Sequence, residues 1–371
     1  MMDYIIYITK IALYFVLAEF LCKVIQKKDI LPLYFVKAMF VGLLFAVYSG
    51  FVISKSELDG DKAFYAMAFS EGWYVADTES VGLNFVFELL REYTLNPYMM
   101  FAFFSFANIF IGLMAYKISR QSNALSLRYM MISYFPLIGF YAYKQCIADA
   151  FLYCSYAVFL NTYIFKASSQ KLFCFLFTIG FLILSICFHR SAYFMVGVLA
   201  LCILYKIKSF HRIINIGLLL LPFVFLILQS YVFANLNSIN ENLANRSESY
   251  SDGAGLASNF LVVLKALPFI MVAYVGTKMK PNLERKIANY DVFLLLTYFT
   301  VEFSVLAIYS YWYNRFVWYL YFPVFVFTSL LARENIRIRI FGTHWNKVFY
   351  YMTVLFTLIL ISEYYFLYGG L

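Results

Sequence analysis

The stretch "LFCFLFTIGFLILSICFHRSAYF", residues 172–194, indicates the fold class. Its first 17 residues, Leu172 to Phe188, contain no charged side chain. An apolar run that approaches about 20 residues is long enough to cross the hydrocarbon core of a bilayer as a helix. His189 and Arg190 interrupt the run, and a second apolar run follows. This pattern is typical of two membrane helices joined at a water boundary.

Apolar runs of this kind recur along the whole chain. It has 371 residues, of which 64% are hydrophobic, 22% are aromatic and only 13% are charged. A soluble globular domain is roughly half apolar and about a quarter charged. Backbone groups in lipid have to be hydrogen-bonded within the chain, and no alternating strand pattern is visible. We therefore predict an all-α polytopic membrane protein, with residues 1–371 forming a single transmembrane domain.

The apolar runs predict about twelve transmembrane helices. They lie near residues 4–22, 33–53, 97–116, 129–143, 146–165, 172–188, 191–205, 213–233, 259–277, 291–311, 315–332 and 348–366. The first run has neither a basic region before it nor a small-residue cleavage site. We therefore expect it to be a retained helix and not a signal peptide.

Positive charge predicts how these spans are oriented. Of the 29 Lys and Arg residues, 19 lie in or beside every second connection: Lys23, Lys27, Lys28, Lys117, Arg120, Arg128, Lys166, Lys171, Lys206, Lys208, Arg212, Lys278, Lys280, Arg285, Lys286, Arg333, Arg337, Arg339 and Lys347. The positive-inside rule places these connections in the cytoplasm, and both termini outside. The net charge of +9 is then explained by orientation, so we expect no nucleic-acid partner.

Two predicted external loops, residues 54–96 and 234–258, are long enough to carry chemistry. The first contains "VGLNFVFELLREY", whose apolar residues Leu83, Val86, Phe87 and Leu90 have helical spacing. We predict a short interfacial helix there. The second loop is polar and rich in Asn and Ser. The six cysteines all lie in apolar runs without metal-ligand spacing, so we expect apolar packing, no metal and no cofactor.

Ionisable residues at membrane depth cost a few kcal/mol on insertion scales, and each is a functional candidate. We expect Lys10, Glu19 and Lys37 to snorkel to the boundary. At the predicted external ends of four hairpins stand Lys144 with Gln145 and Asp149, His189 with Arg190, Lys265, and Arg315. Cations that share one depth repel each other unless an anion is bound among them. A phosphate or diphosphate matches their donors, and the alternative is that each cation reaches lipid head groups.

Two other features leave alternatives open. Aromatic residues surround Arg315 in "YSYWYNRFVWYLYF", residues 309–322, and suit either an interfacial belt or a sugar-binding surface. Asp61 and Glu79 lie in the first external loop. They are either part of a solvated acidic loop or candidates for a general base, as is neutral His189.

Three stretches resemble the EpsG-like branch of the Wzy family of polysaccharide polymerases. "GDKAFYAMAF" carries Asp61 and Tyr65, and "ESVGLNFVFELL" carries Glu79. "YKQCIADAFLYCSYAVFL" with the later "LSICFHRSAYFM" carries Lys144, Gln145, His189 and Ser191. The family usually has Arg where this chain has Lys144, and one residue between the Gly and Asp that are adjacent here as Gly60 and Asp61.

The resemblance implies a fold like that of the C-type glycosyltransferases, in the bacterial inner membrane, with the active site facing the periplasm. It implies a polymerase that transfers a growing glycan from undecaprenyl diphosphate to a lipid-linked repeat unit. Lys144, Arg190 and Arg315 would bind the diphosphate, His189 or Asp61 would be the base, and Glu79, Tyr65 and Gln145 would position sugars. The implied partners are the lipid-linked oligosaccharide, membrane lipid, a chain-length regulator and a flippase. The alternatives are a lipid-linked oligosaccharide flippase or transporter, or an O-antigen ligase.

Overall fold

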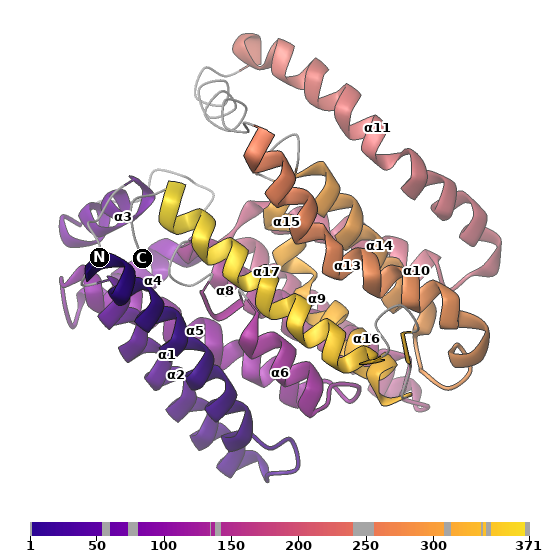
Figure 1. Ribbon diagram of the computed structural model, residues 1–371, viewed down its shortest axis with the longest axis horizontal. Coiled ribbons are helices and arrows are strands. Elements are labelled where there is room, and N and C mark those ends of the chain that lie inside the picture. The colour runs from indigo at the N-terminus through magenta and orange to yellow at the C-terminus, as the bar shows by residue number, and fades with distance from the viewer. Residues whose placement is uncertain are drawn as a thin grey trace. The chain divides into compact units, whose positions relative to one another are not determined.

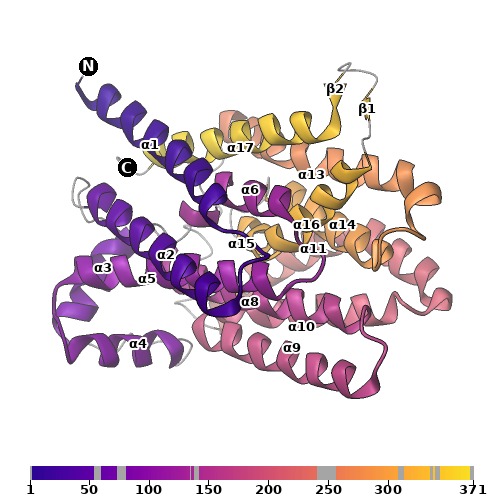
Figure 2. The same cartoon turned by 90° about the horizontal axis from the view of Figure 1, so that it is seen from below.

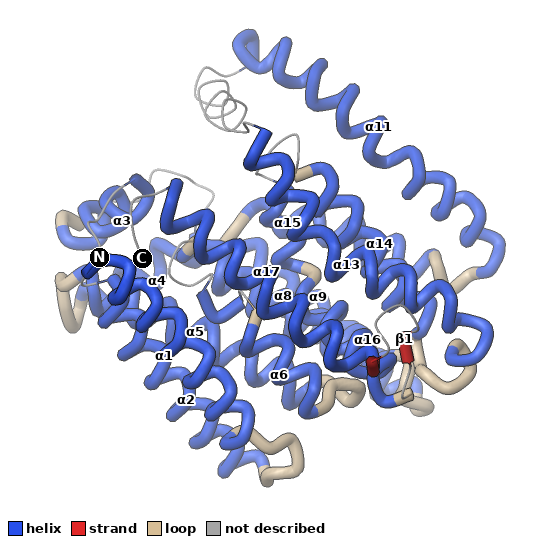
Figure 3. Tube along the Cα trace, in the orientation of Figure 1, coloured by secondary structure: helices blue, strands red, loops and turns tan. Residues whose placement is uncertain are grey.

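The computed structural model describes residues 2–53, 60–72, 81–133, 135–137, 142–239, 256–307, 313–334, 337–338 and 343–367. This part of the chain is helical, apart from one antiparallel pairing of β1 (Arg337–Ile338) with β2 (Thr343–His344) (Figure 3). The prediction of an all-α fold is thereby confirmed. The chain divides into two compact units, each of which we describe separately. Unit 1 is Met1–Tyr193 with Thr328–Leu371, and unit 2 is Phe194–Phe327.

The helices of both units are labelled in Figures 1 and 2. Unit 1 contains α1 (Met2–Val24), α2 (Leu31–Ile53), α3 (Gly60–Ser70), α4 (Val81–Arg91), α5 (Pro97–Ile118), α6 (Ala124–Ile132), α8 (Tyr143–Thr162), α9 (Ser168–Phe188), the 3-10 turn η1 (Arg190–Ala192) and α17 (Trp345–Leu367). The helices α10 (Tyr193–Leu204), α11 (Lys208–Ile239), α13 (Leu256–Leu283), α14 (Tyr290–Leu306), α15 (Asn314–Tyr319) and α16 (Tyr321–Arg333) make up unit 2, except that α10 starts and α16 ends in unit 1.

Three stretches of the described chain are long and apolar enough to cross a membrane: Leu31–Ser49, Pro97–Ile118 and Ser168–Phe188. Shorter apolar helices cover Arg190–Leu204, Tyr321–Arg333 and Trp345–Ile361. The many exposed Leu, Phe, Ile and Val side chains on α2 and α9 are those expected of helices that face lipid. The chain is thus a helical protein with helices suited to a membrane, and the number of about twelve spans stays a prediction.

Buried polar side chains fix the directions of the unit 1 helices. The Tyr34 hydroxyl on α2 donates to the Leu113 carbonyl on α5 at 2.6 Å, and Ser105 donates back to Phe45, so α2 and α5 are antiparallel. The contacts of α5 with α8 are instead parallel, because the thiols of Cys146 and Cys154 approach the carbonyls of Phe104 and Ile111 in the same order along both helices. Gly112 of α5 also lets the segment that follows α6 approach closely, because a Cβ at this position would lie 2.5 Å from the Phe135 ring.

Helices α8 and α9 form an antiparallel pair. The Ser155 hydroxyl donates to the Thr178 carbonyl at 2.9 Å, and the Ser185 hydroxyl donates to the Ala148 carbonyl at 2.8 Å. Each step toward the N-terminus of α8 is therefore matched by a step toward the C-terminus of α9. Continued by one helical turn, this register brings the position of His189 level with Lys144.

In unit 2, α14 packs against α13 and α15. The Tyr290 hydroxyl donates to the Gly276 carbonyl at 2.5 Å, and the Phe293 ring stacks on Phe327 at a centroid distance of 5.5 Å. A Cβ at Gly276 would lie 2.9 Å from the same Phe327 ring, so the absence of a side chain there permits this packing. The connection from α13 to α14 is held by an ion pair of 2.6 Å between Lys280 and Asp291.

Two local predictions have clear outcomes. The short helix expected in loop 54–96 is confirmed as α4, with Leu83, Val86 and Phe87 buried and Leu90 half-buried. The continuous span expected near residues 129–143 is wrong in its first part, because α6 covers Ala124–Ile132 and ends at Ser133. The Ser133 hydroxyl donates to the Met130 carbonyl and accepts from the Phe135 amide. Pro136, which cannot donate a backbone hydrogen bond, follows at once.

Candidate functional site

The two ends of unit 1 differ in the residues they gather. One end contains α3, α4, the first turns of α8 and the C-terminus of α9, and we call it the Lys144 end. The other contains residues 25–30, 117–124 and Arg333, with the adjoining Asp29–Lys37 pair and the Glu19–Arg128–Tyr350 cluster, and we call it the Lys27 end. Lys117 donates to the carbonyls of Lys27 and Asp29 at 2.6 Å, which joins two connections predicted to be cytoplasmic. The helix directions place the two ends on opposite sides of the unit.

The two short helices of the Lys144 end are fixed to each other by Arg91. This residue ends α4, and its guanidinium donates to the carbonyls of Ala68 and Phe69, in the last turn of α3, at 2.5 and 2.9 Å. The same guanidinium lies over the rings of Phe69 and Phe87, at 5.7 and 5.5 Å from their centroids. A cation that bonds the C-terminal carbonyls of a helix stabilises that end. Arg91 therefore holds α3, and with it Tyr65, in place.

Helix α4 is also fixed against the end of α9. Gly82 lies so close to α9 that a Cβ at this position would be 2.9 Å from the Phe188 ring and 3.1 Å from the Cys187 carbonyl oxygen. Phe188 in turn packs on Phe151 of α8, with the ring centroids 5.8 Å apart. The predicted external helix α4 thus contacts α9 directly before His189.

The contact between Lys144 and Tyr65 brings together two of the predicted site residues. The Lys144 ammonium, in the first turn of α8, lies 5.4 Å from the centroid of the Tyr65 ring on α3. Both side chains are half-buried. A cation over an aromatic face is held there electrostatically. The arrangement therefore presents a fixed positive charge beside an aromatic ring.

His189 stands where α9 ends, in extended backbone with φ −151° and ψ 117°. Its backbone amide donates to the Ser185 carbonyl at 3.0 Å, and its Nδ1 lies 2.5 Å from the Ser191 hydroxyl. When Nδ1–H donates to Ser191, Nε2 is left as an acceptor and suits a general base. Arg190 follows as an exposed residue at the start of η1. The half-buried imidazole and the exposed guanidinium are thus level with Lys144 in the α8–α9 register.

Gln145 and Asp149 extend the site into the interior of unit 1. Gln145 is 1% exposed and Asp149 is fully buried. They are one helical turn apart on α8. Neither carboxyl oxygen has a hydrogen bond of ordinary length among the described residues. The sequence placed Asp149 beside Lys144 without a role, and its burial makes it a candidate that the sequence reasoning missed.

The other predicted site residues are only partly described. Asp61 lies in the first turn of α3, but its side chain, like the whole of Glu79, lies outside the described residues. Arg315 is half-buried in α15, and Lys265 is 3% exposed in α13, both in unit 2. The structure therefore brings Lys144, Gln145, Tyr65, His189 and Arg190 to one end of unit 1. That Arg315 and Lys265 join them stays a prediction.

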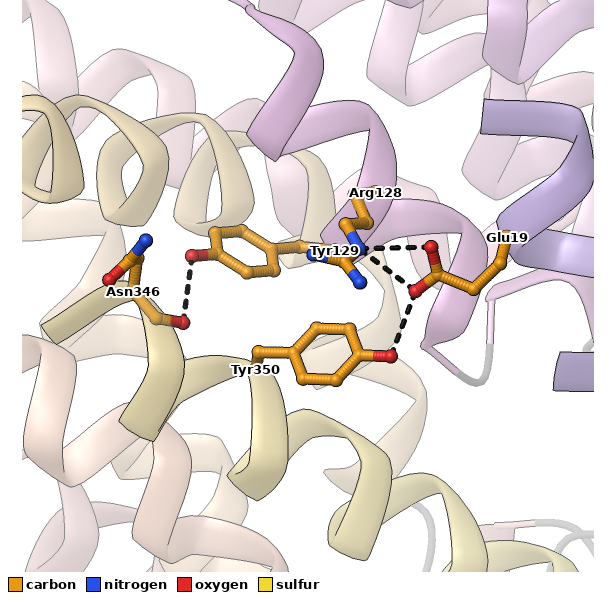
Figure 4. Close-up of polar contacts among 5 residues, drawn as sticks. All are labelled: Glu19, Arg128, Tyr129, Asn346 and Tyr350. Atoms are coloured by element: carbon orange, nitrogen blue, oxygen red, sulfur yellow. Dashed lines mark hydrogen bonds and ion pairs between the residues drawn. The ribbon is translucent and has the colours of Figure 1, made fainter. Parts of the chain in front are cut away.

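Of the residues expected to snorkel, Glu19 and Lys37 have charged partners within unit 1. Glu19 of α1 accepts from Arg128 of α6 and from the Tyr350 hydroxyl of α17, both at 2.8 Å (Figure 4). The Arg128 guanidinium also lies 4.2 Å from the centroid of the Tyr350 ring, and the Tyr129 hydroxyl donates to the Asn346 carbonyl. Lys37 pairs with Asp29 at 2.7 Å, and Lys10 is 3% exposed. That these side chains also reach the membrane boundary stays a prediction.

Comparison of the chain with protein-family models, with curated proteins and with solved structures gives no match.

Proposed function

We propose that this chain is a membrane glycosyltransferase that polymerises a lipid-linked glycan, taking the growing chain from undecaprenyl diphosphate. The observation that carries the proposal is the contact of Lys144 with Tyr65, level with His189 and Arg190 at one end of unit 1. Residues far apart in the sequence that resemble the polymerase motifs thereby meet at one place. The finer fold, about twelve spans arranged as in C-type glycosyltransferases, belongs to the same proposal.

In this proposal the cations stabilise the leaving group. The bond between the anomeric carbon and the diphosphate oxygen breaks, and negative charge develops on that oxygen. Lys144 and Arg190 would neutralise this charge, and the sequence adds Arg315 as a third candidate cation. Fixed positive groups aimed at a developing charge lower the barrier, since they need no reorganisation during the reaction. Undecaprenyl diphosphate is the leaving group, and it dissociates from these cations as an anion.

The acceptor sugar would be activated at His189. Its hydroxyl oxygen attacks the anomeric carbon, and Nε2 takes the hydroxyl proton while Nδ1–H remains bonded to Ser191. Asp61 is the alternative base. The Tyr65 ring offers a flat apolar face to a sugar, and Gln145 offers an amide. Glu79, in the first external loop, would hold a further hydroxyl. All of these groups belong to connections that positive charge predicts to be periplasmic.

Reconstitution with the lipid-linked repeat unit tests the proposal. Purified full-length protein in liposomes should convert the repeat into a ladder of longer glycans, separated on a gel. Lys144→Ala, Arg190→Ala and Arg315→Ala should each shorten or abolish the ladder, while Lys144→Arg should keep most of it because the charge is retained. Lys171→Ala, at the opposite end of the α8–α9 pair, is the matched control. Movement of the substrate across the bilayer without any ladder would favour a flippase.

A further inference from the structure

A second cationic site lies at the Lys27 end of unit 1. A cavity of about 390 Å³ opens there, bounded by residues of the α1–α2 connection, the α5–α6 connection and the end of α16. Its charged lining residues are Lys27, Lys28 and Arg333, and no acidic residue lines it. Lys117 stands behind Lys27, whose backbone carbonyl it bonds at 2.6 Å. Three cationic residues therefore line a space large enough for a small ligand, and a fourth stands behind one of them.

Two nearby carboxylates have other partners, and a third, Glu334, follows Arg333 as an exposed residue. Asp29, which is next in the chain to Lys28, is paired with Lys37 at 2.7 Å. Glu19 is bound by Arg128 and Tyr350. Lys28 and Arg333 are exposed, and neither forms an ion pair with another described residue. At neighbouring positions of the same unit, by contrast, Lys37 and Arg128 do have carboxylate partners.

Lys27 supplies charge to the cavity while its donors are occupied. Its ammonium donates to the Ser119 carbonyl, to the Ser122 carbonyl at 2.7 Å and to the Ser122 hydroxyl at 2.8 Å. These bonds hold the charge in place at the cavity wall. Burial, and then the nearby Arg333 and Lys117, lower the pKa of Lys27 to about 8. The ammonium form is therefore under repulsion that an anion in the cavity would relieve.

The donors left for a ligand come from Arg333 and Lys28. A guanidinium binds two oxygens of a phosphate group at once, and an ammonium adds a mobile point charge. The cavity is also lined by Asn123 and Ala124 at the start of α6, where the helix dipole favours negative charge. A tetrahedral oxyanion satisfies all three features.

We propose that the cavity lined by Lys27, Lys28 and Arg333 binds a phosphate group. Its source is either the head group of an anionic phospholipid or a soluble phosphate ester. Both would come from the cytoplasmic side under the orientation that positive charge predicts. The proposal is independent of the polymerase activity, because the cavity and the Lys144 end lie on opposite sides of unit 1.

The test uses full-length protein in nanodiscs and two probes. In discs of phosphatidylcholine, titration with glycerol phosphate, followed by calorimetry, measures binding of a soluble ester. In discs that mix phosphatidylcholine with phosphatidylglycerol, native mass spectrometry measures the anionic lipid retained by the protein. The variant Lys28→Gln with Arg333→Gln removes two exposed side chains without described partners, so the fold is expected to persist. Lys166→Gln with Lys171→Gln removes the same charge on the α8–α9 connection and serves as the control.

The expected result is that one probe binds the parent and the control equally, and binds the Lys28→Gln/Arg333→Gln variant at least about tenfold more weakly. Binding of glycerol phosphate alone identifies a soluble ester as the source, and selective retention of phosphatidylglycerol identifies a lipid. Either outcome supports the site. Equal binding by all three proteins, or no binding of either probe to the parent, overturns it. Arg333→Lys, which keeps the charge, should bind more weakly than the parent where bidentate recognition operates.

Discussion

The two ends of unit 1 both gather cations, but they use them differently. At the Lys27 end, Lys37 and Arg128 are paired with carboxylates, and Lys27 and Lys117 donate to backbone carbonyls. At the Lys144 end, the Lys144 ammonium lies over the Tyr65 ring, level with His189 in the α8–α9 register. The predicted orientation would account for Lys27, Lys117 and Arg128, and not for Lys144. The comparison shows that the partners of a charged side chain tell a structural role from a candidate site. The mere occurrence of the charge in the sequence does not.

The largest expected effect is a loss of glycan transfer on mutation at the Lys144 end, with little loss on mutation at the opposite end of the α8–α9 pair. Lys144→Ala should slow glycan transfer by about 100-fold or more, because it removes a preorganised charge from the leaving group. The reconstituted ladder assay measures this rate. Lys171→Ala, on the other end of the same helix pair, should leave the rate within about twofold of the parent. A normal ladder from Lys144→Ala would show that both ends are structural.

Packing between α4 and α9 provides a second contrast. Gly82→Ala should destabilise the protein by about 1–3 kcal/mol, because the new methyl group would contact the Phe188 ring and the Cys187 carbonyl. Gly180→Ala on α9 is the matched control, since a Cβ there meets nothing within 4 Å. That change should be neutral, or stabilising by up to about 1 kcal/mol. Unfolding in detergent followed by circular dichroism compares the two, and equal effects would contradict the close α4–α9 packing.

Oxyanion binding at the Lys27 end should depend on pH. The pKa of Lys27 is about 8 without ligand, and a bound anion raises it, so binding takes up a proton and weakens as pH rises through 8. Sulfate is a suitable probe because its own charge is constant. Its affinity should fall by up to about tenfold between about pH 7 and about pH 9.

The other titratable and charged groups around Lys27 are Cys22, Lys28, Asp29, Tyr116, Lys117 and Arg333. Lys27→Gln isolates the contribution of Lys27, and its melting temperature shows whether the protein remains folded. The pH dependence should disappear in this variant. A slope that persists would assign the titration to another of these groups.

The smallest expected effect concerns the paired charges of the Lys27 end. Tyr350→Phe removes one hydrogen bond to Glu19 and should cost about 1 kcal/mol. Tyr351→Phe, at an exposed position of the same helix, should change the stability by less than about 0.5 kcal/mol. Neither variant should alter glycan transfer. A loss of activity in Tyr350→Phe would show that the Glu19 cluster contributes to function.

Part of this architecture could be predicted from the sequence. The spacing of Leu83, Val86 and Phe87 was sufficient to locate α4, because apolar residues three or four positions apart lie on one face of a helix and are buried together. Alternation of positive charge anticipated the opposed directions of α2 with α5 and of α8 with α9. Hydropathy predicted a continuous helix through Ser133. The helix α6 ends there, within an apolar run, because the Ser133 hydroxyl bonds the backbone and a proline follows.

The contacts within the candidate site were less predictable. The partners of Glu19 lie 109 and 331 residues away, and the rotation of one helix against another is not recorded in hydropathy. For the same reason, the sequence grouped Lys144 with other cations but gave no sign that its neighbour would be Tyr65. The burial of Asp149 depends on α5 and α9 covering α8, and a count of embedded charges does not show it.

The Glu19 cluster has a consequence for biosynthesis. The ribosome adds roughly 5–20 residues per second, so Tyr350 emerges roughly 15–70 seconds after Glu19, from which it is 331 residues distant. Arg128 is translated 109 residues after Glu19 and is the partner of the α1 carboxylate for the rest of that interval, in which all of residues 194–327 are translated. A nascent chain arrested before α17 would therefore hold α1 by one contact fewer, which makes this helix a natural place for quality-control proteases to recognise an unfinished protein.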